Sequence, residues 1–273
     1  MYKKQGYLKE EFKIFKLKDK STKSFNFHYH DFYKLIVFMD GNVNYSIEGK
    51  NYELKPGDIV VVSTNEIHRP VIDPLANYER IVLYLSQSFL NQDERLSECF
   101  KETHLKHTNV LRLTAGDYRH LIDTLDKAIK KETEDDYAGN LYSKLYVTES
   151  LLIINESVYK NGLLFEGAVD YDRKIIEVCE YINTHLKEDL SVDALSEKFF
   201  ISKYYFMRKF KEYTGVTVHN YILEKRLLNT KSLTDSGEKV STACIESGFK
   251  DYSTYLRAKK RITLRLIESY DHE

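Results

Sequence analysis

The sequence predicts a multidomain protein of α and β structure, with an N-terminal β-barrel or jelly roll carrying helices and an all-α C-terminal domain. Strand-like alternation between Phe25 and Ser86, and helical periodicity in the rest of the chain, are two of the observations behind this prediction. The third is the length of 273 residues, which exceeds what one small core requires. With 42% hydrophobic residues, and with 41 Lys and Arg against 42 Asp and Glu, the composition excludes disordered, collagen-like and coiled-coil fibre classes.

The chain shows neither a membrane segment nor a secretion signal. No stretch approaches the eighteen or so consecutive apolar residues that span a bilayer, and the N-terminus Met1-Tyr2-Lys3-Lys4 runs into charged sequence. Cys99, Cys179 and Cys244 are odd in number and far apart, which excludes a disulfide framework and a zinc pattern. We therefore expect a cytoplasmic protein without membrane contact.

Short strands follow one another in the N-terminal part. They are predicted at Phe25–His30, Tyr33–Asp40, Val43–Glu48, Tyr52–Lys55, Asp58–Ser63, Ile67–Ile72 and Tyr78–Leu85. Asp40-Gly41-Asn42 and Glu48-Gly49-Lys50-Asn51 supply the residues that hairpin turns need. About seven strands without intervening helices indicate a closed barrel or a sandwich.

Two long helices are predicted next, at 117–134 and 137–160. The second helix is apolar on more than one side, with one seam along Leu141, Leu145, Thr148, Leu152 and Tyr159. Such a helix packs either against a second subunit or wholly inside its own domain, and both interpretations stay open. The turn formers in 161–172 predict a linker, and the domains are predicted at 1–165 and 166–273.

Two short helices joined by a tight turn follow in the C-terminal part. Ser191 is a good N-cap for 192–199, Ser202 caps the next helix, and Gly215 ends it. Its outward face is predicted to carry Lys203, Tyr204, Met207, Arg208 and Lys211. In a helix-turn-helix, Arg208 can donate two hydrogen bonds to guanine, the lysines can meet phosphates, and Tyr204 and Met207 can touch thymine methyl groups. An ordinary three-helix bundle with a solvated basic face is the alternative.

A second copy of this pattern favours the helix-turn-helix interpretation. A short helix at 240–247 ends at Gly248, and Asp251 caps a further helix from Tyr252. The helix 219–233 between the copies would hold them at a fixed separation, which suits successive major-groove segments of one DNA face. Residues 198–265 contain 15 basic and 6 acidic residues, a balance that suits a polyanion.

From about Ile175 to Arg261 the sequence resembles the AraC/XylS family of bacterial transcription regulators. The resemblance is carried by Leu190-Ser191-Val192, Leu195-Ser196-Glu197, Ser202 through Phe210-Lys211, Tyr213-Thr214-Gly215, Arg226-Leu227 and Glu246-Ser247-Gly248-Phe249-Lys250-Asp251-Tyr252-Ser253. It implies base contacts by Tyr204, Met207 and Arg208, and by Tyr252, Ser253, Leu256 and Arg257. After Arg257 the family's aromatic core residue, glycine and proline are missing. Since such an aromatic contributes ~3–5 kcal/mol, we expect the second unit to dock less firmly.

The N-terminal part resembles the cupin motifs of the same family's sensor domains. One motif is His28-x-His30 with Lys34 and Gly41, and the other is Gly57, Ser63, Asn65 and His68. His28 and His30 must share one face of a strand. Lys34 stands where cupins carry an acidic metal ligand, and an ammonium repels a cation. We therefore expect a ligand-sensing cupin without metal or other cofactor.

The expected effector-binding residues are His28, His30, Lys34, Tyr45 and His68. Each has an alternative: His68 could merely end a strand, Tyr45 could lie outside the barrel, and Lys34 could face solvent or form a salt bridge. The resemblance implies a sugar or related metabolite as the effector. An inward Lys34 could instead bind a carboxylate or phosphate, so a charged effector stays open.

These features predict a sequence-specific, DNA-binding transcriptional regulator that responds to a small molecule and is not an enzyme. We expect a homodimer, which would raise avidity for DNA, and contact with RNA polymerase if the protein activates transcription. One alternative is a metal-dependent cupin enzyme, such as a sugar isomerase or dioxygenase, with a helical appendage. Another is a partner-binding module that has lost DNA binding.

Overall fold

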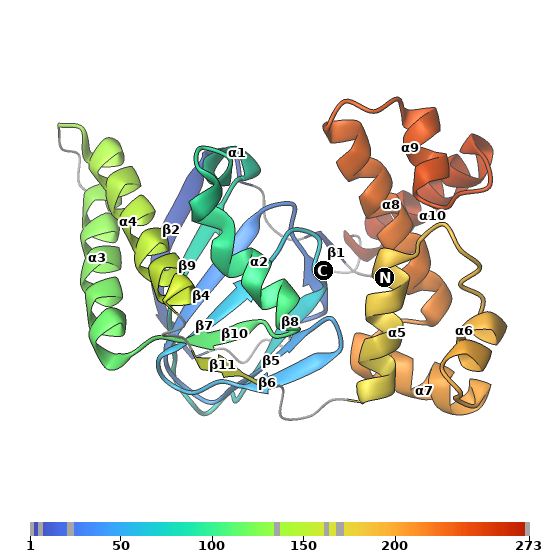
Figure 1. Cartoon of the computed structure of the whole chain (residues 1–273), viewed down its shortest axis with the longest axis horizontal. Coiled ribbons are helices and arrows are strands. Elements are labelled where there is room, and N and C mark those ends of the chain that lie inside the picture. The colour runs from blue at the N-terminus through green and yellow to red at the C-terminus, as the bar shows by residue number, and fades with distance from the viewer. Residues whose placement is uncertain are drawn as a thin grey trace. The chain divides into compact units, whose positions relative to one another are not determined.

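The chain folds into two compact units, described here from a computed structural model (Figure 1). One unit is built from Lys4–Ile47 with Asn51–Asp170, and the other chiefly from Tyr171–Glu273. The structure describes residues 3–4, 8–20, 25–133, 137–160, 164–167 and 172–270. Within these ranges no helix has the length and apolarity that crossing a membrane requires.

The strands form two antiparallel-paired sheets. They are β1 (Lys3–Lys4), β2 (Phe12–Asp19), β3 (His28–Tyr29), β4 (Tyr33–Asp40), β5 (Val43–Ile47), β6 (Lys50–Glu53), β7 (Asp58–Val62), β8 (His68–Ile72), β9 (Tyr78–Leu85), β10 (Val110–Arg112) and β11 (Leu164–Glu166). One sheet has the order β1-β3-β8-β5-β6 and the other β11-β10-β7-β4-β9-β2. Two sheets enclosing a common core make the cupin-like jelly roll that the sequence predicts.

Alternation along β4 separates two cores. Ile36 and Phe38 pack with residues of the other sheet, such as Tyr45 and Ile47, between the two sheets. Leu35 and Val37 point to the opposite face and join the core formed with the helices. Position 34 shares the face of Ile36, so its side chain turns toward the interior between the sheets.

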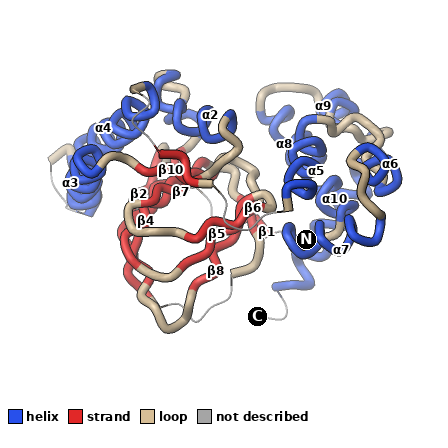
Figure 2. The backbone as a smooth tube through the Cα atoms, turned by 60° about the horizontal axis from the view of Figure 1, so that its bottom comes forward, coloured by secondary structure: helices blue, strands red, loops and turns tan. Residues whose placement is uncertain are grey.

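Helices cover the outer face of the larger sheet (Figure 2). They are α1 (Gln87–Leu90), the 3₁₀ helix η1 (Glu94–Ser97), α2 (Glu98–Leu105), α3 (Ala115–Thr133) and α4 (Gly139–Tyr159). Leu151 and Ile154 of α4 are buried, whereas the predicted apolar seam has Leu141, Leu145, Leu152 and Tyr159 exposed. This seam therefore lacks a covering surface within the described part of the unit.

The structure adds strands that the sequence did not predict. The strand β2 pairs along its whole length with β9, and β10 pairs with β7 and β11. The segment predicted as a linker, 161–172, contains β11, so Leu164–Glu166 form a strand instead. Residues 161–163 and 168–171 of that segment lie outside the described residues. The domain boundary between 165 and 166 stays a prediction.

The C-terminal unit is helical. It consists of α5 (Arg173–Thr184), α6 (Val192–Lys198), α7 (Lys203–Thr214), α8 (Val218–Asp235), α9 (Val240–Glu246) and α10 (Tyr252–Tyr270). The pairs α6–α7 and α9–α10 are the two predicted helix-turn-helix units, and α8 connects them. The predicted fold class is confirmed.

Candidate functional site

The first helix-turn-helix is defined by its caps and its turn. The Oγ atoms of Ser191 and Ser202 accept hydrogen bonds from the backbone N–H groups of Ala194 (3.2 Å) and Tyr205 (3.4 Å), so each serine caps its helix as predicted. Between the helices, Phe200 takes a φ of 53° and its side chain is 91% exposed. A left-handed conformation is uncommon for a bulky side chain, and here it turns the chain sharply from α6 into α7.

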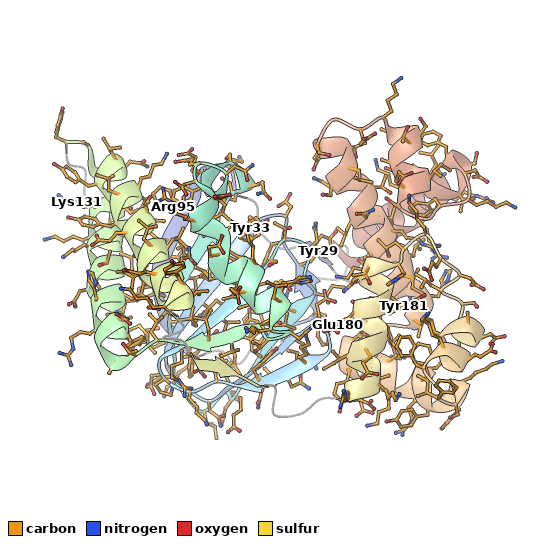
Figure 3. The ribbon with its side chains drawn as sticks, viewed as in Figure 1. Tyr29, Tyr33, Arg95, Lys131, Glu180 and Tyr181 are labelled. Carbon is orange, nitrogen blue, oxygen red and sulfur yellow. The ribbon has the colours of Figure 1, made fainter. Side chains whose placement is uncertain are left out.

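One face of α7 is anchored in the core of the unit. Phe206 and Phe210 are fully buried and meet edge to face, with ring centroids 5.6 Å apart. Phe210 also packs edge to face on Tyr221 of α8, at 5.2 Å. Tyr181 of α5, labelled in Figure 3, packs on Phe199, and the ammonium of Lys198 lies 4.3 Å from its ring. These contacts fix α7 on α8, and the end of α6 on α5.

The opposite face of α7 carries the five residues predicted to contact DNA. Lys203, Tyr204, Met207, Arg208 and Lys211 are all exposed, with Tyr204 at 76%. Lys203 forms a 2.8 Å ion pair with Asp193 of α6. Within the described ranges, the side chains of Arg208 and Lys211 form no hydrogen bond or ion pair. The face thus offers two unengaged cations beside two large apolar side chains, which suits phosphates and base edges.

The second helix-turn-helix has the same layout. The backbone N–H of Thr254 donates to Asp251 Oδ1 (2.6 Å), which caps α10 and lowers the pKa of the Asp251 carboxyl. Tyr255, Ala258, Phe249 and Cys244 form the buried cluster of this unit. The four residues predicted to face DNA are exposed: Tyr252, Ser253, Leu256 and Arg257.

Polar contacts as well as packing connect the two helix-turn-helix motifs, several of them made by helix α8. Arg226 donates from Nε to the carbonyl oxygen of Leu186 (2.9 Å) and from an Nη to that of Glu188 (3.2 Å), in the loop before α6. Asn229 donates to the Ser247 hydroxyl (3.0 Å) at the end of α9, and Lys187 pairs with Glu246. The recognition helices themselves also pack on α8, α7 through Phe210 on Tyr221 and α10 through its buried cluster on Leu223 and Leu227.

The interior of the jelly roll brings the three predicted histidines together. His28 and His68 face each other on paired strands, with ring centroids 4.4 Å apart, and His30 lies 4.8 Å from His68. The Nδ1 atoms of His28 and His68 lie 2.9 Å from the carbonyl oxygens of Asn26 and Glu66. An Nδ1–H donated in this way leaves Nε2 as an acceptor. Desolvation lowers the pKa of His28 to about 4 and that of His68 well below its usual value.

A metal ion was the alternative occupant of this cluster. The potential ligand atoms of His28, His30 and His68 all lie within 4.8 Å of one another, and neutral imidazoles are competent ligands. The acidic fourth ligand is replaced by Lys34, which is buried beside them. A cation next to the cluster opposes binding of a second cation.

A cavity of about 220 Å³ lies beside the histidines. It is lined by Phe15, Leu17, Phe25, His28, His30, Lys34, Ile36, Tyr45, Pro70, Tyr78, Arg80, Val82 and Tyr84. Four predicted effector-binding residues therefore line it, and the fifth, His68, stacks on the ring of Tyr45 (6.0 Å). The hydroxyl of Tyr45 and Nε2 of His68 are buried without a hydrogen-bond partner in the described part of the chain. Tyr45 lies inside and Lys34 does not face solvent.

The sequence analysis missed Arg80, Tyr78 and Tyr84 of this cavity. They alternate on β9 and so share one face, and Tyr84 is the register partner of Lys34 on β4. The period-two pattern of 78–85 was the available signal, but it does not say which face turns inward.

Comparisons with known proteins give matches to both the jelly-roll unit and the helical unit. The family model described as the AraC-like ligand binding domain matches residues 16–130, and a helix-turn-helix domain model matches residues 195–272. The HTH-type transcriptional activator RhaS of Enterobacter sp. (strain 638) is 24% identical over 245 residues, which cover 84% of this chain and 82% of that protein. The probable transcriptional regulator LumQ of Photobacterium leiognathi is 26% identical over 242 residues, covering 88% and 89%.

Among solved structures, ToxT from Vibrio cholerae matches with a TM-score of 0.35 at 16% sequence identity, covering 91% of this chain and 93% of that one. The ligand-binding model matches before the helix-turn-helix model along the chain. The two relatives are both described as transcriptional regulators or activators, and the match covers most of their length. The chain belongs to the AraC family of DNA-binding transcriptional regulators.

Proposed function

We propose that the exposed faces of α7 and α10 contact base edges in two successive major-groove segments, and that a small molecule in the jelly-roll cavity controls this binding. The observation that carries the DNA-binding half is the exposed face of α7, where Arg208 and Lys211 have no hydrogen-bond or ion-pair partner among the described residues and lie beside Tyr204 and Met207. A merely solvated helix face has no need of two large exposed apolar side chains. Both recognition helices begin at a defined cap, Ser202 for α7 and Asp251 for α10.

Selection of bound duplexes from a random DNA pool tests this proposal. The full-length protein should enrich a site with two conserved blocks about one helical turn, ~10–10.5 bp, apart. Recovery of the starting pool unchanged, at moderate salt and with metabolite extract present, would contradict sequence-specific binding. Repeating the selection with and without extract shows whether a small molecule changes the outcome, as a ligand does when it favours one of two states.

We also propose that the exposed seam of α4 packs against a second copy of the chain. Leu141, Leu145 and Leu152 are exposed on one face of the helix, and Tyr159 continues it. An apolar stripe with this spacing is typical of a helix that pairs with another helix. A dimer would place four recognition helices on one DNA and raise avidity.

Replacing both Leu145 and Leu152 by Glu should convert a dimer into a monomer, as measured by light scattering after gel filtration. The matched control is Leu105→Glu, which places the same charge on another exposed leucine, at the end of α2. If the wild type is monomeric at tens of micromolar, this proposal is wrong. If the protein activates transcription, contact with RNA polymerase follows, and an in vitro transcription assay measures it.

A metal-dependent enzyme is the second candidate function, and only the histidine cluster favours it. Elemental analysis of the purified protein decides the matter. Stoichiometric iron, nickel or zinc that is lost in His28→Ala would favour this candidate, whereas the regulator needs no metal.

A further inference from the structure

The charge of the jelly-roll cavity is one-sided. Two cationic side chains, Lys34 and Arg80, line it together with His28 and His30. No acidic side chain is among the described residues that line it. Lys34 is 9% exposed and Arg80 is 8% exposed, so both charges are largely removed from water. Buried charges in proteins are normally paired, because an unpaired one is costly.

Among the described residues, Lys34 finds no counter-ion. Its side chain leaves the inward face of β4, and its ammonium lies 5.8 Å from the ring centre of Tyr84. In the described part of the chain it forms neither a hydrogen bond nor an ion pair. Burial, with a smaller contribution from the charge of Arg80, lowers the pKa of Lys34 to about 7. A bound anion would supply a counter-ion that none of the described residues provides.

Arg80 lines the same cavity as Lys34 and is held in place by Tyr78. An Nη of its guanidinium donates to the carbonyl oxygen of Tyr78 (2.9 Å), and the guanidinium carbon lies 3.8 Å from the centre of the Tyr78 ring. Stacking on an aromatic ring fixes the plane of the guanidinium. A fixed guanidinium and an ammonium that line the same cavity suit a carboxylate, because its oxygens accept hydrogen bonds from cationic donors.

The rest of the wall is apolar or aromatic, with Phe15, Leu17, Phe25, Ile36, Tyr45, Pro70, Val82 and Tyr84. Apart from histidine nitrogens and tyrosine hydroxyls, the polar groups among the lining residues described are cationic, and none is a carboxylate or amide, the side chains that accept most readily from sugar hydroxyl groups. The cavity volume of about 220 Å³ is below the ~300–1,000 Å³ of pockets for drug-sized ligands. The occupant is therefore small, with an apolar body.

We infer that the cavity binds a small organic acid, whose carboxylate meets Lys34 and Arg80 and whose apolar body lies against the aromatic wall. The inference rests on the proposed function, because it names the class of effector for that same cavity. It replaces the sugar implied by family resemblance with the charged effector that an inward Lys34 left open.

Isothermal titration calorimetry of the full-length protein tests the inference with matched probes. Benzoate and hexanoate are the acids, benzyl alcohol and hexan-1-ol are their neutral counterparts, and inorganic phosphate is an anion without an apolar body. We expect at least one acid to bind, and to bind 10-fold or more tighter than its alcohol and than phosphate. Equal binding of acid and alcohol, binding of phosphate alone, or binding of none of the five overturns the inference.

Two variants test whether Lys34 supplies the positive charge that binds the acid. Lys34→Met should weaken binding of the acid 10-fold or more while leaving binding of the alcohol unchanged. Lys18→Met makes the same substitution on an exposed lysine of β2, which pairs with Glu79 at 2.9 Å, and should change neither. Equal acid affinity in Lys34→Met and wild type also overturns the inference.

DNA selection on the same preparations separates this inference from the proposed function. If the protein selects DNA but binds none of the acids, only the effector class inferred here is wrong. A protein that selects no DNA contradicts the regulator itself, whatever binds in the cavity.

Discussion

The two helix-turn-helix units present similar faces to solvent but differ in their cores. In α7, Phe206 and Phe210 are both buried, and Phe210 reaches Tyr221 of α8. In α10, the position at the same distance from the N-cap as Phe210 is Lys259, which is exposed. Tyr255 packs edge to face on Phe249 at 5.5 Å, and Ala258 supplies only a methyl group. Helix α10 thus presents an exposed face similar to that of α7, although fewer aromatic side chains are buried beneath it.

The two turns differ as well. The left-handed position is Phe200 in the first unit and Gly248 in the second, with φ values of 53° and 85°. A Cβ on Gly248 would lie 1.9 Å from the carbonyl oxygen of Leu186, so only glycine fits there. Phe200 has no such neighbour constraint and is almost fully exposed. The second unit therefore depends on close backbone packing at its turn, and the first on its aromatic core.

The largest effect is expected from the core of the first unit. Phe210→Ala should lower the free energy of unfolding by ~3–5 kcal/mol, because it removes a fully buried aromatic side chain. Lys259→Ala, at the corresponding position of α10, should stay within ~0.5 kcal/mol. Urea titration followed by circular dichroism measures both. Equal losses in the two variants would mean that the cores do not differ as described.

Substitutions at the two turns should change the free energy of unfolding in opposite directions. Gly248→Ala should destabilise by more than about 2 kcal/mol, from the clash with Leu186 and the left-handed backbone. Phe200→Gly should stabilise by up to about 1 kcal/mol, because relief of the left-handed conformation exceeds the entropy that glycine adds to the unfolded chain. The same urea titration gives both signs. A stabilising Gly248→Ala would refute the close approach.

The two arginines that we propose to contact DNA provide the next comparison. Arg208→Ala should weaken specific binding by ~1–3 kcal/mol and relax selectivity at one base position. Arg257→Ala should cost less, because Arg257 donates to Thr254 Oγ1 (3.2 Å) in the free protein and lies on the more lightly anchored helix. Competition binding at fixed salt measures both, with Lys131→Ala on α3 as the control for loss of one charge. Unchanged preference in Arg208→Ala would reject the assignment.

The smallest effect concerns the first residue of each recognition helix. Lys203→Ala should reduce the slope of log K against log salt by about 1 without changing sequence preference, because a phosphate contact is lost. The corresponding residue of α10 is Tyr252, which is neutral, so Tyr252→Ala should leave the slope unchanged. Binding isotherms at several salt concentrations decide this. Identical slopes in wild type and Lys203→Ala would place Lys203 away from the phosphates.

The sequence was informative where structure is local. The caps Ser191 and Ser202, the glycine stop at Gly215 and the period of the aromatic residues were sufficient to predict α6, α7 and the exposed face of α7. The loss of the aromatic after Arg257 was also visible in the sequence. The burial of Ala258 depends on packing near Leu223 and Leu227 of α8 and was not visible in the sequence, and neither was the continuation of α10 to Tyr270.

The cavity was only partly predictable because it is built from distant strands. His28, His30 and Lys34 could be predicted because they belong to one motif within a short stretch of sequence. Arg80 did not, because the inward face of β9 is set by its pairing with β4 and β2. The pairing partner β2 was itself missed, because the alternation of apolar and charged residues in Phe12–Asp19 is interrupted by the consecutive apolar residues Ile14 and Phe15.

DNA selection with three proteins in parallel tests the central claim most directly, namely that α7 and α10 each contact their own bases on one DNA. Wild type should enrich two blocks about one helical turn apart. Arg208→Ala should lose preference at a position in one block, and Arg257→Ala at a position in the other. If both variants lose the same position, or if neither changes the enriched sequence, the account of two recognition helices is wrong.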